Sequence, residues 1–106
     1  MGVAWVAGTM LAAPAFASGP ICGANTGEAA SGDPIIVGGI HGNAAPGDFS
    51  ASTDAAAAYF ACVNANGGIH GRPVDYRVEN DQWNPELAAQ AAAKLVKDAG
   101  SVALVG

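Results

Sequence analysis

From residue 34 onward, apolar and polar residues follow one another in blocks, each with the length and period of one secondary-structure element. A nearly continuous apolar run, PIIVGGI (34–40), contains β-branched residues and is typical of a short strand buried on both faces. The next stretch, HGNAAPGDFS (41–50), has the composition of a loop. Residues 50–65 are alanine-rich and predict a helix, which ends at Asn-Gly-Gly (66–68) because these residues tolerate the left-handed backbone of a helix end.

The second half of the chain repeats this order. Residues 72–80, RPVDYRVEN, alternate apolar and charged side chains and predict a strand with one polar side, at a sheet edge. The helix that follows begins with Asn84 as N-cap and Pro85 in the first position, and it stops at Gly100. The run SVALVG (101–106) predicts a third strand.

The order strand, helix, strand, helix, strand predicts an α/β fold with a parallel, doubly wound, Rossmann-like sheet. Ligands bind such sheets outside the carboxyl ends of the strands. Here those ends are GGIHGNAAPGDFS (38–50) and ENDQWNP (79–85). The glycine-rich turn NGGIHGRP (66–73) precedes a strand instead, so we expect it at the opposite edge with a structural role, and His70 as a solvated turn residue.

Charge and composition exclude one class of function. The chain of 106 residues carries four Lys and Arg against nine Asp and Glu, a net charge of −5, and has no basic run. It therefore lacks the electrostatic means to hold a phosphate backbone, and we expect no nucleic acid partner.

The N-terminus predicts export. Residues 1–17 are apolar, contain no ionisable side chain and end in Ala-Phe-Ala, the pattern of a signal-peptide cleavage site, although no Lys or Arg precedes Val3. A membrane anchor is the alternative, disfavoured by the short span and by Pro14. Residues 18–33 then form an N-terminal extension, and the mature protein is expected to be periplasmic or extracellular.

In an oxidising compartment the two cysteines, Cys22 and Cys62, predict a disulfide. A zinc site would have to recruit His41 and His70, whose positions match no paired-ligand spacing, so no metal is expected.

The loops carry no catalytic motif. A dinucleotide fingerprint after the first strand would need glycine at Val37, a Walker loop would need an absent lysine, and G-x-S-x-G does not occur. Glu79 and Asp81 fit turn formers and solvated surface better than acid–base residues. We expect neither an enzyme nor a cofactor.

Several segments together carry a family resemblance. They are the helix end AYFACVNANGGIHGRPV (58–74), with the pattern N-x-x-G-G-I-x-G-R inside it, the element ENDQWNP (79–85) and the helix with its strand, ELAAQAAAKLVKDAGSVALVG (86–106). From about residue 35 to 106 the chain resembles the N-terminal part of the leucine/isoleucine/valine-type periplasmic binding proteins of ABC transporters. The resemblance implies a two-lobed type I binding fold and a small solute, such as an amino acid, held between the lobes.

Family members are several hundred residues long, so residues 34–106 would form only the first part of lobe 1. The loop that holds an amino-acid carboxylate in the family would begin after Gly106. We therefore expect a truncated chain that binds no solute by itself, an expectation that tight binding in calorimetry would contradict.

The resemblance also points to ligand-side residues: His41, Asn43 and Phe49 after the first strand, and Trp83 after the second. The alternatives are that His41 and Asn43 are turn residues, that Phe49 covers the core side of the following helix, and that Trp83 packs on its own helix. The function implied is a solute-binding subunit that delivers a small solute to an inner-membrane ABC permease. A ligand-sensing receptor module of the same fold is the alternative.

Overall fold

The computed structural model describes residues 21–106, and the predicted signal peptide (1–17) lies outside them. Three parallel strands, β1 (Ile35–His41), β4 (Val74–Asn80) and β5 (Ala103–Leu104), form one sheet in the order β4-β1-β5. The predicted parallel α/β fold is confirmed, and β4 is an edge strand as its polar face predicted.

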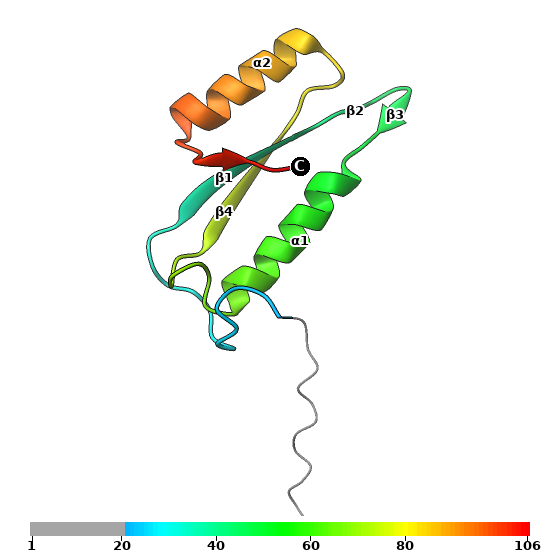
Figure 1. Cartoon of the computed structure of the whole chain (residues 1–106). Coiled ribbons are helices and arrows are strands. Elements are labelled where there is room, and N and C mark those ends of the chain that lie inside the picture. The colour runs from blue at the N-terminus through cyan, green and yellow to red at the C-terminus, as the bar shows by residue number, and fades with distance from the viewer. Residues whose placement is uncertain (1–20) are drawn as a thin grey trace, which may run out of the picture.

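Two helices connect the strands. Helix α1 (Ala51–Ala65) joins β1 to β4, and α2 (Pro85–Ala93) continues into a π-helical turn, η2 (Lys94–Asp98), before β5. In Figure 1 the sheet is seen nearly edge-on, with α2 on one face and α1 on the other. This arrangement follows from the strand order. The connection from β1 to β4 and the connection from β4 past β1 to β5 run in opposite directions across the sheet, so right-handed crossovers place their helices on opposite faces.

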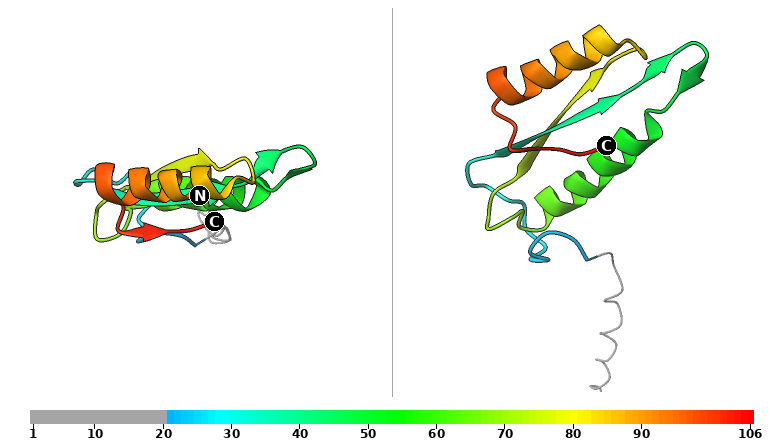
Figure 2. Two further views of the ribbon diagram at one scale, coloured as in Figure 1. Left: turned by 90° about the horizontal axis from the view of Figure 1, so that it is seen from above. Right: turned by 45° about the horizontal axis from the view of Figure 1, so that its top comes forward.

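The segment predicted as a loop after the first strand is more ordered than expected. His41 extends β1 by one residue, and an antiparallel hairpin follows, formed by β2 (Asn43–Ala44) and β3 (Gly47–Asp48). The prediction of a plain loop was wrong here, because residues 43–44 and 47–48 pair as antiparallel strands around a two-residue turn, Ala45 and Pro46. Figure 2 shows this hairpin extending beyond the rest of the sheet.

The core consists of a small apolar layer on each face of the sheet. On the α1 face, Val63 and Val74 are buried, and the ring of Phe60 lies 5.1 Å from that of Tyr76. On the α2 face, Ala91 and Leu95 are the buried side chains, and Leu95 is only 1 % exposed. Burial of one leucine side chain contributes about 1.5–3 kcal/mol. Because few side chains are buried on each face, the packing of each helix on the sheet depends on very few residues.

Two adjacent glycines in β1 allow both layers to approach the central strand. A Cβ on Gly38 would lie 2.7 Å from Leu104 and 3.0 Å from Leu95, and a Cβ on Gly39 would collide with the hydroxyl of Tyr76. Successive residues of a strand point to opposite faces, so Gly38 leaves room for the side chains of the α2 face and Gly39 for those of the α1 face.

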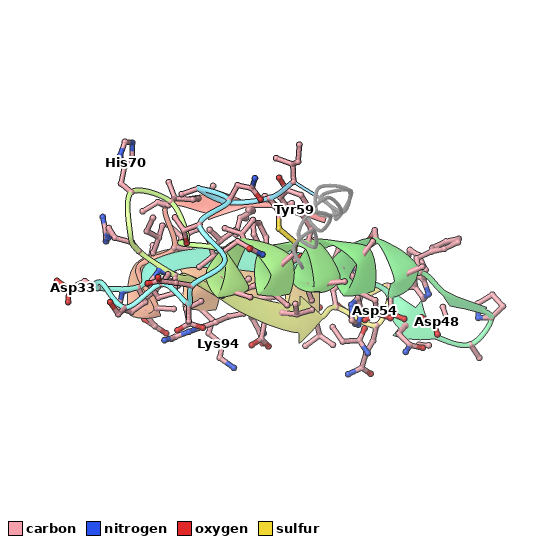
Figure 3. The ribbon with its side chains drawn as sticks, turned by 90° about the horizontal axis from the view of Figure 1, so that it is seen from below. Asp33, Asp48, Asp54, Tyr59, His70 and Lys94 are labelled. Carbon is pink, nitrogen blue, oxygen red and sulfur yellow. A yellow bond between two sulfur atoms is a disulfide. The ribbon has the colours of Figure 1, made fainter. Side chains whose placement is uncertain are left out.

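The predicted disulfide between Cys22 and Cys62 is confirmed and joins the N-terminal segment to the end of α1. The Sγ–Sγ bond is the yellow stick in Figure 3. Closing a loop across a sequence separation of 40 residues contributes about 4 kcal/mol in the chain-entropy model. Arg72 holds the same segment by donating its Nε–H to the carbonyl of Asp33 at 2.8 Å.

The turn at residues 66–73 lies at the edge of the sheet opposite the hairpin, as predicted. Gly67 and Gly68 have positive φ angles of 94° and 65°, and His70, with φ 51°, is exposed. Figure 3 shows His70 and Asp48 at opposite ends of the molecule. No helix within residues 21–106 is long and apolar enough to cross a membrane.

Candidate functional site

The residues predicted on the ligand side all fall at the carboxyl end of the sheet. His41 is the last residue of β1, Asn43 belongs to β2, and Phe49 lies between the hairpin and α1. Trp83 lies between β4 and α2. The structure therefore gathers them at one edge, where Phe49 and Trp83 form an aromatic pair and His41 forms a polar pair with Thr53 of α1.

The aromatic pair consists of Phe49 and Trp83. Their rings meet edge to face, with centroids 5.0 Å apart and an interplanar angle of 89°. Together with Pro46 and Gly47 they line a shallow, mainly apolar pocket of about 410 Å³. Phe49 is 64 % exposed and Trp83 is 45 % exposed, so both rings leave apolar surface available to a ligand.

Trp83 packs on the hairpin rather than only on its own helix. Its indole Nε1–H donates to the carbonyl of Gly47 at 3.0 Å. The ring also covers Gly42 so closely that a Cβ there would lie 2.7 Å from the nearest ring carbon. The hairpin therefore fixes the orientation of the indole.

The indole of Trp83 is positioned by two consecutive residues with an unusual, left-handed backbone conformation. Gln82 and Trp83 both have left-handed φ angles, 53° and 61°, which cost about 1–2 kcal/mol each for residues with a Cβ. Two side chains hold the turn: Asn80 Oδ1 accepts from the N–H of Gln82 at 2.9 Å, and Asp81 Oδ1 accepts from the N–H of Trp83 at 2.8 Å. Asp81 is thus a turn former, as the sequence indicated.

Asn80 also anchors the hairpin, a role that sequence reasoning missed. Its Oδ1 accepts from the N–H of Asn43 at 2.9 Å, and its Nδ2 donates to the carbonyl of Asn43 at 2.9 Å. The parallel register that pairs His41 with Asn80 brings the two loops this close. The side chain of Asn43 remains exposed.

The polar pair is His41 and Thr53, a second residue that sequence reasoning missed. His41 Nδ1 lies 2.7 Å from the hydroxyl of Thr53, in the first turn of α1. That hydroxyl also donates to the carbonyl of Ser50 at 2.9 Å, and Thr53 is only 1 % exposed. The imidazole is therefore held at its Nδ1 by a buried group of the helix.

The site also carries a fixed negative charge. Hydrogen bonds from Ser50 lower the pKa of Asp48, chiefly through the Ser50 backbone N–H at 2.8 Å. The Asp48 carboxylate is therefore ionised at neutral pH. Within residues 21–106, no three His, Cys, Asp or Glu side chains lie close enough together to hold a metal ion.

A larger hollow of about 480 Å³ lies elsewhere, beside the disulfide-linked segment. It is lined by Gly23, Ala24, Tyr59, Phe60, Val63, Gly68, Ile69 and His70. Because it lies away from the carboxyl ends of the strands, the general rule for parallel sheets favours the smaller aromatic pocket as the ligand site.

Open parallel sheets bind ligands at the edge where these side chains gather, so the fold is of an α/β class whose ligand sites lie at this position. The family model described as periplasmic binding protein matches residues 34–106, and the chain belongs to that family. No curated protein and no solved structure gave a significant match.

Membership of the family supports a solute-binding role in general. The family is generally non-enzymatic, and it suggests a periplasmic location, with which the disulfide between Cys22 and Cys62 is compatible.

Proposed function

We propose that this protein is the exported solute-binding subunit of an ABC importer. It captures a small solute, such as an amino acid, in the periplasm and delivers it to a permease in the inner membrane. The observation that carries the proposal is the half-exposed aromatic pocket of Phe49 and Trp83, at the ligand edge of a chain that belongs to the periplasmic binding protein family.

The chemistry of the edge suits a solute with an apolar and a polar part. The apolar part would rest on the faces of Phe49 and Trp83, where it removes aromatic surface from water. The polar part would lie toward His41 and Asn43, whose backbones the structure already fixes through β1 and the amide of Asn80. Pre-organised groups of this kind lower the entropy cost of binding.

The exposure of the two rings limits the affinity expected of the full chain. A solute on Phe49 and Trp83 would keep its outer face in water, because the described residues cover it from one side only. We expect a Kd of about 1 mM or weaker, which corresponds to about −4 kcal/mol. The sequence-based expectation was that the chain binds no solute by itself; it stays a prediction, and weak binding at the aromatic pocket is the alternative that we propose from the structure.

Fluorescence of Trp83 tests the proposal. The other tryptophan, Trp5, is replaced by phenylalanine so that Trp83 is the one tryptophan of the chain, and it is excited at a wavelength that Tyr59 and Tyr76 do not absorb. Amino acids, small amides and urea are then added one at a time, up to about 50 mM so that a millimolar site is filled. At least one of them should change the emission of Trp83 along a saturable curve.

Two variants in the Trp5→Phe background locate the response. Phe49→Ala removes one wall of the pocket and should weaken the saturable change. Tyr59→Ala alters the larger hollow near the disulfide and should leave the change as it was. A response that Tyr59→Ala abolishes and Phe49→Ala spares, or no saturable response to any solute, would contradict the proposed function.

A further inference from the structure

The hydrogen bonds around Thr53 fix the position of a proton on His41. A threonine hydroxyl has one hydrogen to donate. It is used on the carbonyl of Ser50, 2.9 Å away, because a carbonyl oxygen cannot donate in return. In the 2.7 Å contact between Thr53 Oγ1 and His41 Nδ1, the hydroxyl is therefore the acceptor and Nδ1 must carry a hydrogen.

This assignment determines what the other ring nitrogen offers. A neutral imidazole has one N–H and one lone pair. With the hydrogen on Nδ1, Nε2 is a hydrogen-bond acceptor. Within residues 21–106, Nε2 makes no hydrogen bond to the protein, and the side chain is only partly buried at the carboxyl end of β1. The acceptor is thus available at the ligand edge.

Burial makes the arrangement persistent. Thr53 is 1 % exposed, so water cannot readily replace its hydroxyl as the partner of Nδ1. The tautomer with the hydrogen on Nε2 would turn the lone pair of Nδ1 toward the hydroxyl oxygen at 2.7 Å, unless the hydroxyl gave up its bond to the carbonyl of Ser50. Asp48 adds a second acceptor and a negative charge to the same edge.

We propose that Thr53 is a positioning residue that holds the hydrogen of His41 on Nδ1, so that Nε2 accepts a hydrogen bond from the solute. The solute would therefore present an N–H or O–H donor at this point rather than a carboxylate. The choice of solute chemistry rests on the proposed function, whereas the tautomer of His41 does not.

Imidazole ¹⁵N spectra of the full chain test the tautomer. They are recorded at about pH 8.5, where an ordinary histidine is neutral. In the unmodified chain and in Thr53→Ser, His41 should show an N–H-type Nδ1 and a lone-pair-type Nε2. In Thr53→Val, which keeps the shape but removes the acceptor, the signals of His41 should move toward those of the exposed His70, the internal reference. A lone-pair-type Nδ1 in the unmodified chain, or a Thr53→Val spectrum unchanged at His41, would overturn the assignment.

Two probes of equal chain length then test what Nε2 accepts. Propylammonium chloride should shift the His41 Nε2 signal in the unmodified chain and in Thr53→Ser, with about tenfold weaker affinity in Thr53→Val if one hydrogen bond of about 1.4 kcal/mol is lost. Sodium propionate should leave Nε2 where it was. A shift with propionate, or none with propylammonium, would overturn the acceptor role.

The two proposals fail in different experiments. If the solute-binding function is wrong, Trp83 fluorescence responds to no solute, yet the tautomer of His41 is unchanged. If the role of Thr53 is wrong, the ¹⁵N spectra show it whether or not Trp83 responds.

Discussion

At the scale of single residues, the candidate site depends on a glycine. Gly42 has no Cβ, and the ring of Trp83 occupies the space where one would be, with three ring carbons 2.7–2.8 Å from the Cβ position. This contact lets the indole cover the hairpin and reach the carbonyl of Gly47. Gly47 itself has open space around its own Cβ position.

Gly42→Ala should therefore destabilise the protein, and Gly47→Ala should not. The added methyl at position 42 forces the Trp83 ring to move, and overpacking of this kind costs about 1–3 kcal/mol. The free energies of unfolding are measured by urea titration, with Trp83 as the probe in the Trp5→Phe background. Equal values for the two alanine variants would show that the contact with Trp83 has no energetic consequence.

Residues of the site differ in how far the sequence reveals them. His41 directly follows the first predicted strand, and Phe49 and Trp83 lie in the segments that connect the predicted strands to the next helices, so the rule for parallel sheets is enough to place them at the carboxyl end of the sheet. Thr53 and Asn80 act through hydrogen bonds to residues 12 and 37 positions away. Those contacts depend on strand register and helix rotation, which a local pattern does not determine.

At the scale of elements, the two helices begin in different ways. Asn84 caps α2 with its side chain, whose Oδ1 accepts from the N–H groups of Glu86 and Leu87 at 2.8 and 3.1 Å. Ser50, at the N-cap of α1, makes no such side-chain bond. The sequence predicted the cap of α2 because Asn followed by Pro and Glu is a strong start pattern. It did not predict the π-helical turn of η2, where the N–H of Ala99 reaches the carbonyl of Lys94.

Asn84→Ala should lower the free energy of unfolding by about 1 kcal/mol, because two N–H groups at the start of α2 lose their acceptor. Ser50→Ala, the matched change at the start of α1, should cost clearly less. Thermal or urea unfolding followed by circular dichroism compares the two. A larger loss for Ser50→Ala than for Asn84→Ala would contradict this description of the caps.

At the scale of the whole molecule, the two ends of the sheet differ in structure. The end that carries His70 is tied down by the disulfide, by Arg72 and by the glycine turn of residues 66–68. The opposite end presents the hairpin, the aromatic pair and His41. The sequence predicted this division, since it follows from the order of strands and helices along the chain. The hairpin and the small size of each core layer became visible only in the structure.

The central claim is that a small solute binds at the carboxyl end of the sheet, and backbone amide spectra test it most directly. Two-dimensional ¹H–¹⁵N spectra of the full chain are recorded with leucine, glutamine, acetamide and urea in turn, each at about 50 mM, well above a millimolar Kd. For at least one solute, the account predicts shifts concentrated in residues 41–50 and 80–84. Shifts confined to residues 59–72, or no shift with any of the four, would contradict it.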